Sequence, residues 1–251
     1  RFLLLYLYIL VDTFMKTKKN NKVNKNKTRK NKQKPTDFLF GYGSLINNKS
    51  ISHTGKSNIG KSIPVVLKKS AGFRREWVCF PNSRHGEYSF LAIKKSKSKS
   101  HNIHGVLAPI YRNIKDFDKR ESGYKRIKIK YDPNKKCCFK SLCGYKLPDY
   151  KCTIHFYIVS HNASKPTNHC PVTQNYIDVV VVGSMYYGLD FSEKVIKNIK
   201  GWRGKDNIVH WINDRTKRKK RDYMKNVSSK TLKKVDKILK KVIPGFFKKR
   251  I

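Results

Sequence analysis

A series of six short apolar runs in the first half restricts the fold of this 251-residue chain more than any other feature. Breaks rich in Ser, Gly, Asn and Lys separate the runs, and each run has the length of a strand. In Tyr124–Tyr131 the apolar Ile127 and Ile129 alternate with lysines, as in a strand with one exposed face. The sequence therefore predicts a sheet built from residues 38–40, 63–68, 73–80, 88–93, 103–111 and 124–131.

The second half has helical patterns. After loops and one strand at 153–159, the apolar density of Val172–Tyr187 predicts a buried helix, and Phe191–Ile199 predicts a shorter amphipathic one. A last helix has Ser229 as its expected N-cap, Pro244 as its stop and lysines on its polar face. Its apolar residues recur at helical spacing: Leu232, Val235, Ile238, Leu239, Val242 and Ile243. Strands early and helices late predict an α+β fold.

The two ends of the chain are strongly basic, and residues 1–36 and 215–251 together carry more than half of the net charge of +42. Residues 1–36 are interpreted as a spurious or disordered leader, with Met15 as the expected start of the protein. The apolar stretch within this leader is too short to span a bilayer, so no transmembrane segment is expected. We expect one domain over 37–223 and a basic amphipathic helical tail over 224–251.

Six cysteines allow a zinc site or disulfides in principle. A zinc site usually shows two close cysteine pairs, and no Cys-x-x-Cys spacing is present. Nothing else in the sequence supports secretion, so we expect reduced, mostly structural thiols and a cytoplasmic protein. Five of the six cysteines fall in a basic segment over 132–170 that is interpreted as an insertion.

The segment Gly55–Ser62 matches the phosphate-loop pattern G-x-x-x-x-G-K-S letter by letter. The chemistry of that loop needs a buried strand before it and a helix after it. Here a polar stretch precedes the match, and Pro64 with a strand-like run follows it. We therefore do not expect nucleotide binding at this segment.

A second glycine motif, Phe38–Ile46, has a more suitable context. An apolar strand breaks at Gly41-Tyr42-Gly43-Ser44, where a tight turn would expose consecutive backbone N–H groups. Such a turn binds a carboxylate or an oxyanion. An ordinary strand-to-loop turn is the alternative that this motif alone leaves open.

Four motifs in order across about 90 residues resemble γ-glutamylcyclotransferases, in particular the ChaC-like branch and its protist relatives. Phe40–Leu45 is similar to the opening motif of the family, and Ala71–Trp77 to its Gly-aromatic-x-Arg-x-Trp strand. Gly105–Ile110 resembles its Gly-Val-Leu-x-Pro-Val strand, and Asp118–Arg126 its Asp-x-Arg-Glu block. The resemblance covers about 37–223 and implies a small mixed β-barrel with helices.

The resemblance also implies an activity. Members of the family release 5-oxoproline from glutathione or another γ-glutamyl compound by intramolecular attack of the α-amine, without a metal or cofactor. It assigns the general base to Glu121, whose alternative role is a surface ion pair with Arg120 or Lys125. It places substrate at the turn, with Tyr176 either reaching the substrate or lying in the core. The expected binding residues are Tyr42, Gly43, Ser44, Leu45 and Tyr176.

A second hypothesis comes from the charge. Such a basic chain favours nucleic acid or anionic surfaces, so a catalytically inactive family member that binds them through its tails is the alternative. The plainer explanation is that Lys and Asn are enriched together, as in an AT-rich coding sequence.

Overall fold

A computed structural model describes residues 34–55, 62–79, 88–98, 101–111, 114–159, 163–217 and 221–251. Pro35–Ile251 forms one compact unit. The expected leader lies outside the described residues except at positions 34–36. The structure therefore does not bear on its predicted disorder.

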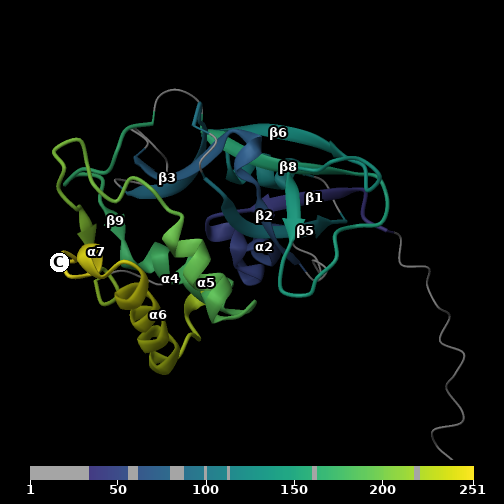
Figure 1. The fold of residues 1–251 in the computed structure, drawn as a ribbon. Coiled ribbons are helices and arrows are strands. Elements are labelled where there is room, and N and C mark those ends of the chain that lie inside the picture. The colour runs from purple at the N-terminus through teal and green to yellow at the C-terminus, as the bar shows by residue number, and fades with distance from the viewer. Residues whose placement is uncertain are drawn as a thin grey trace, which may run out of the picture. The chain divides into compact units, whose positions relative to one another are not determined.

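The larger sheet has six strands in the order β6-β8-β1-β5-β2-β7 among the described residues (Figure 1). The central strand β1 pairs in parallel with β8 and antiparallel with β5, so the sheet is mixed. Each strand is a predicted apolar run except β7, which the sequence did not indicate. The strands are β1 (Asp37–Gly41), β2 (Ile63–Leu67), β5 (Ile103–Ile110), β6 (Tyr124–Tyr131), β7 (Phe139–Ser141) and β8 (Cys152–Val159).

Residues 132–170 supply two strands of this sheet. β8 lies between β1 and β6, and β7 forms the edge beside β2. This segment, interpreted from the sequence as an insertion, therefore contributes a central strand and buried core residues such as Ile154 and Phe156.

A second sheet has the order β10-β9-β4-β3 among the described residues. β3 (Phe73–Cys79) pairs antiparallel with β4 (Ser89–Lys95), while β9 (Val172–Thr173) runs parallel to β4 and to β10 (Trp211–Ile212). No pairing among the described strands joins the edges of either sheet. The expected closed barrel is thus corrected to two open sheets, because β3 and β4 pair with β9 instead of completing the six-stranded sheet.

Six α-helices lie in the described part of the chain, beside three short 3₁₀ turns. α4 is buried by its neighbours on nearly every side, and its residues are accordingly mostly apolar. The high density of apolar residues in Val172–Tyr187 predicted this buried helix. α2 was not expected, since only three of its eight residues are buried and its sequence is polar. The helices are α2 (Asn48–Gly55), α3 (Lys115–Arg120), α4 (Gln174–Met185), α5 (Leu189–Lys197), α6 (Ser229–Val242) and α7 (Pro244–Phe247), and the turns are η1 (Ser44–Ile46), η2 (Lys69–Ala71) and η3 (Asp222–Met224).

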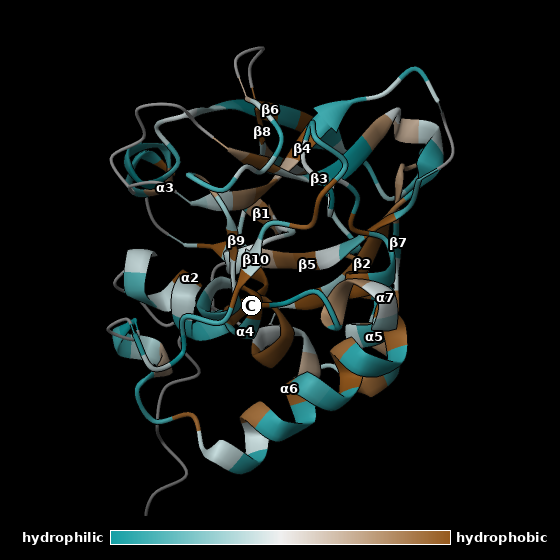
Figure 2. Cartoon of the chain, turned by 90° about the vertical axis from the view of Figure 1, so that its left-hand side faces the viewer, coloured by the Kyte–Doolittle hydropathy of each residue, from teal (hydrophilic) through white to brown (hydrophobic). Residues whose placement is uncertain are grey.

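The basic helix α6 packs its apolar stripe against α4 and α5 (Figure 1). Val235 and Leu239 are fully buried, and Figure 2 shows hydrophobic and hydrophilic residues alternating along the helix. Its side-chain cap is Ser228, one residue before the predicted one, whose Oγ accepts the N–H of Thr231 at 3.2 Å. The lysines of α6 are exposed. Within the described residues, no helix combines the length and the apolar content that crossing a bilayer requires.

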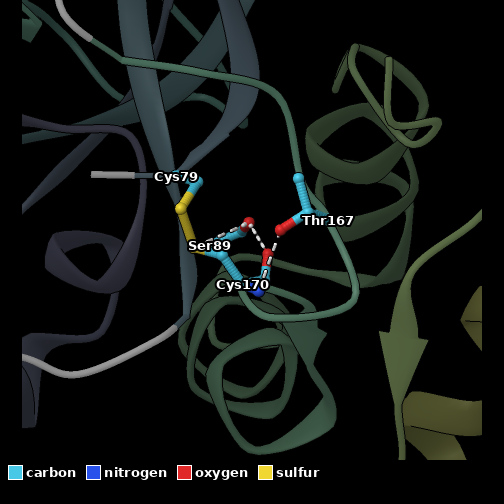
Figure 3. Close-up of a disulfide and its surroundings, with 4 residues drawn as sticks. All are labelled: Cys79, Ser89, Thr167 and Cys170. Carbon is cyan, nitrogen blue, oxygen red and sulfur yellow. Dashed lines mark hydrogen bonds between the residues drawn. A yellow bond between two sulfur atoms is a disulfide. The ribbon is translucent and has the colours of Figure 1, made fainter. Parts of the chain in front are cut away.

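A disulfide joins Cys79, at the end of β3, to Cys170, just before β9 (Figure 3). The surrounding loop is fixed by hydrogen bonds: Ser89 Oγ donates to the carbonyl of Cys170 at 2.7 Å, and the N–H of Cys170 donates to Thr167 Oγ1 at 3.1 Å. This corrects the expectation that all thiols are reduced. The two cysteines are 91 positions apart, so no local spacing indicated the pair. The free thiols are Cys137, Cys138, Cys143 and Cys152.

Replacing Cys79 by Ser is expected to lower the free energy of unfolding by about 2–4 kcal/mol, because the disulfide restricts a long loop of the unfolded chain. Urea denaturation of the oxidised protein measures the change, with the exposed Cys143→Ser as the matched control. Alkylation of the denatured, unreduced protein should label four thiols. Labelling of six thiols, or equal stability of the two variants, would contradict the disulfide.

Candidate active site

The glycine turn follows β1 at the centre of the larger sheet. The strand is held in the core by the buried side chains of Phe38, Leu39 and Phe40. After the strand, the chain turns through Gly43 into η1. A Cβ at Gly43 would lie 2.7 Å from the hydroxyl oxygen of Tyr176. Glycine is required here by the close approach of another side chain.

The turn contains neighbouring backbone donors. The amide of Ile46 donates to the carbonyl of Gly43 at 2.9 Å and closes the turn. The amide of Ser44 donates to the hydroxyl oxygen of Tyr176 at 3.3 Å. Within the described part of the chain, no residue accepts a hydrogen bond from the amide of Leu45. Two neighbouring N–H groups can therefore serve a carboxylate or an oxyanion once the Tyr176 hydroxyl moves aside.

Tyr176 comes from the first turn of α4 and lies over the glycine turn. Its ring packs edge-on against Trp77, with 5.8 Å between ring centroids, and against Phe90, at 5.4 Å. Burial raises the pKa of the Tyr176 hydroxyl, and the nearby charge of Arg221 opposes the rise. The ring of Tyr176 therefore lies in the core while its hydroxyl contacts the turn, and contact of Tyr176 with a substrate stays a prediction.

Glu121 follows α3 directly and has mostly lost contact with water, with 16% of its side chain exposed. The helix ends there as the amide of Glu121 donates to the carbonyl of Phe117 at 2.8 Å, and Phe117 is anchored in the core. Burial raises the pKa of the carboxyl, because the loss of hydration outweighs the attraction of Arg120. A carboxyl whose neutral form is favoured in this way suits proton transfer near neutral pH.

Arg120 connects Glu121 to the glycine turn. Its Nε lies 3.0 Å from Glu121 Oε1, and its Nη2 donates to Ser44 Oγ at 2.9 Å. The same guanidinium donates to the carbonyl and the hydroxyl of Ser50 and to Thr54 Oγ1 on α2, over 2.7–3.0 Å. The ion pair that the sequence offered as the alternative role of Glu121 therefore exists. It is not a pair on the open surface, since both side chains are less than one-fifth exposed.

Two further tyrosines complete the surroundings of the carboxyl. The hydroxyl of Tyr42 donates to the carbonyl of Tyr157 at 2.7 Å, and the hydroxyl of Tyr124 donates to the carbonyl of Leu91 at 3.5 Å. Burial raises the pKa of both phenols, and the negative charge of Glu121 adds to the rise. The same charge raises the pKa of Tyr176, so all three phenols lie within electrostatic reach of Glu121.

Arg75 supports the turn from the protein interior and was not assigned a role from the sequence. Its guanidinium is fully buried and donates to the carbonyls of Tyr42 at 2.8 Å, His104 at 2.9 Å and Val195. Burial lowers the pKa of Arg75 to about 9, so the side chain still carries its charge at neutral pH. The sequence did contain a signal for this role, because Arg75 lies on the face of an apolar strand that is expected to point into the core.

The other sequence motifs lie apart from this cluster. Residues 56–61 of the phosphate-loop match are outside the described residues, but α2 ends at Gly55 and β2 begins at Ile63. The match thus has a helix before it and a strand after it, the reverse of what a phosphate loop needs. Among the described residues, no group of three or more His, Cys, Asp or Glu side chains has the arrangement of a metal site.

No protein-family model and no curated protein sequence matches the chain. Among solved structures, a γ-glutamyl cyclotransferase is similar with a TM-score of 0.46 and 16% identity, over 80% of this chain and 98% of that one. An uncharacterized protein from Homo sapiens gives a TM-score of 0.46 and 17% identity, over 79% and 96% of the two chains. YkqA from Bacillus subtilis gives 0.40 and 17%, over 64% of this chain and 52% of its own.

These similarities are too low, in TM-score and in identity, to carry an argument for activity. Membership of the ChaC-like branch stays a prediction. The functional proposal therefore depends on the arrangement of Glu121, Arg120 and the glycine turn.

Replacing Gly43 by Ala is expected to lower the free energy of unfolding by about 1–3 kcal/mol, because the new methyl overlaps the hydroxyl of Tyr176. Because the Tyr176 ring packs against Trp77 and Phe90, a displacement that makes room for the methyl has a cost in packing energy. Adding Tyr176→Phe removes the overlapping oxygen, so the double variant should lose less stability than the sum of the single variants.

Urea denaturation of the wild type, both single variants and the double variant measures this coupling. Gly245→Ala is the control, since a Cβ at that position meets no atom within 4 Å. Losses that add within about 0.5 kcal/mol would show that Gly43 and Tyr176 do not interact in this way.

Proposed function

We propose that the chain is a γ-glutamylcyclotransferase that releases 5-oxoproline from a γ-glutamyl compound. The observation that carries the proposal is the largely buried carboxyl of Glu121, which Arg120 holds together with Ser44 of the glycine turn. A carboxyl with a raised pKa and neighbouring backbone amides are the two groups that this reaction needs.

The proposed reaction begins with the substrate bound at the turn. Glu121 accepts a proton from the substrate α-ammonium, and the freed amine attacks the γ-carbonyl carbon of the same molecule. The new C–N bond closes a five-membered ring, and the carbonyl oxygen becomes an oxyanion that the amides of Ser44 and Leu45 stabilise. Glu121 then gives its proton to the leaving nitrogen as the original amide bond breaks, and the ring nitrogen gives up its second proton to the departing amine, which leaves as an ammonium. The products are 5-oxoproline and a free amine.

Much of the rate would come from holding the substrate in a folded shape, since nucleophile and electrophile belong to one molecule. The low exposure of the Glu121 side chain would limit competing hydrolysis. Because the reaction transfers an acyl group and one proton, and no electrons, the proposal includes no metal or redox cofactor. Glutathione is one candidate substrate within this class.

The test is the identity and amount of the product. Purified protein incubated with γ-glutamyl amino acids or glutathione is expected to release 5-oxoproline and the free amine in equal amounts, measured by mass spectrometry. Release of glutamate would indicate a hydrolase. Absence of either product with every γ-glutamyl compound would exclude the proposal.

The rate is expected to fall in acid, with an apparent pKa above 4.5, the ordinary value for a glutamic acid side chain. The direction follows because the base must be ionised and burial raises its pKa. Arg120 lowers the pKa of Glu121, so Arg120→Gln should move this acid limb to higher pH, beside any loss of rate. Profiles of kcat/KM against pH provide the measurement, and a limb that moves to lower pH would contradict the assignment.

Binding of nucleic acid or an anionic surface stays a prediction for the basic chain. One observation limits it: the apolar face of α6 is used for packing within the domain, with Val235 and Leu239 buried. The helix therefore has only its lysine face to offer to a partner.

A further inference from the structure

Arg221 precedes η3 and lies at the rim of the candidate site. The short turn that holds it is anchored by Met224, which is 5% exposed. Asn47, the residue after η1, contacts Met224 through Nδ2 and Sδ at 3.8 Å and donates to the carbonyl of Val179 on α4. The position of Arg221 is thus tied to the glycine turn and to the helix that carries Tyr176.

The guanidinium of Arg221 lies 5.8 Å from the ring centroid of Tyr176 and donates to the hydroxyl of Tyr223 at 2.9 Å. The side chain is exposed, and its charge lowers the pKa of both Glu121 and Tyr176. The contact with the Tyr176 ring therefore places an exposed cation next to the side chain that lies over the glycine turn, near enough to Glu121 to lower the pKa of its carboxyl.

Arg221 has no ion pair with any of the residues that the structure describes. The carboxylate of the adjacent Asp222 pairs with Lys225 at 2.6 Å. Glu121 is already paired with Arg120, in closer contact. Arg221 therefore keeps donors for an anion that arrives with a ligand.

We infer that Arg221 binds the carboxylate of the leaving part of the substrate, so the site selects γ-glutamyl amino acids and peptides over γ-glutamyl amines. The inference depends on the proposed function. In that reaction the glutamyl head occupies the buried amides of the turn, and Glu121 faces the leaving nitrogen. Whatever is attached to that nitrogen extends outward past Glu121, where Arg221 lies. A guanidinium binds a carboxylate through two parallel hydrogen bonds, which gives it selectivity over a neutral group.

The test compares two substrates that differ only in this charge, γ-glutamylglycine and γ-glutamylglycinamide. Arg221→Gln is expected to raise KM for γ-glutamylglycine by about 10- to 100-fold, the value of a hydrogen bond to a charged group. KM for γ-glutamylglycinamide should stay within about twofold of the wild type, since that substrate has no carboxylate at this position. Arg221→Lys should give an intermediate value for γ-glutamylglycine. The exposed Arg203→Gln serves as the control for loss of a positive charge elsewhere.

Equal effects on the two substrates would overturn the inference, and a fall in kcat common to both would indicate that Arg221 acts on Glu121. Failure of the proposed function gives a different result, in which the wild type releases no 5-oxoproline from either compound. In that case titration calorimetry still tests the inference, because it measures the affinity of the wild type and of Arg221→Gln for γ-glutamylglycine and γ-glutamylglycinamide. Tighter binding of γ-glutamylglycine that depends on Arg221 supports it, and absence of that preference excludes it.

Discussion

Replacing Glu121 by Gln is expected to lower kcat for release of 5-oxoproline by about 10²- to 10⁴-fold, because glutamine cannot take up the ammonium proton or return it. The side chain keeps its size and its hydrogen-bonding oxygen beside Arg120, so substrate affinity should change little. Initial rates of 5-oxoproline formation measure the loss. Asp116→Asn, an exposed residue on α3 near Glu121, is the matched control and should retain wild-type activity.

The stability of the same variant separates catalysis from a purely structural ion pair. A carboxyl with a raised pKa in the folded state contributes stability below its unfolded pKa and loses it as the pH rises through the folded value. At neutral pH the ionised Glu121 is therefore a net cost to folding, despite Arg120. A neutral glutamine should leave the free energy of unfolding unchanged or slightly higher. A clear destabilisation with little effect on kcat would instead assign Glu121 a structural role.

Local sequence patterns predicted the strands well because each pattern reflects which face of a strand is buried. The alternation in Tyr124–Tyr131 and the apolar run of Ile103–Ile110 both became strands with the expected burial. Helix α6 was predicted in the same way from the helical spacing of its apolar residues. By contrast, α2 is polar in sequence and forms largely because it packs against α3 and η1. Such tertiary support leaves no periodic signal.

The candidate site was likewise predicted only where a local motif was present. The glycine turn and Glu121 were named from motifs, and the structure brings them together through Arg120. The part played by Arg120 was not predicted, because its contacts with Ser44 and Thr54 join positions 66 to 76 residues apart. The disulfide between Cys79 and Cys170 was missed for the same physical reason. Pairings that depend only on the folded chain cannot be read from spacing in the sequence.

Replacing Arg75 by Ala is expected to lower the free energy of unfolding by about 3–5 kcal/mol, the largest stability effect that we predict. The change leaves a cavity and removes the donors from the carbonyls of Tyr42, His104 and Val195, which lie in the glycine turn, β5 and α5. Part of this loss is offset, because the lowered pKa shows that burying the charge is itself unfavourable. The unpaired carbonyls and the cavity outweigh that gain, since several buried polar groups lose their partner at once.

Urea denaturation followed by circular dichroism measures the effect, with Arg74→Ala as a neighbouring control. Arg74 has the same side chain, but its guanidinium pairs near the surface with Glu76 at 2.8 Å, and its side chain is 43% exposed. That pair should contribute less than about 1 kcal/mol. If Arg75→Ala fails to fold, Arg75→Lys provides the measurement, because one ammonium cannot reach three carbonyls in different directions. It should be less stable than Arg74→Lys and slower in releasing 5-oxoproline, as the carbonyl of Tyr42 next to the turn loses its donor. Equal stability of the Arg74 and Arg75 variants would show that the buried guanidinium does not hold the turn in place.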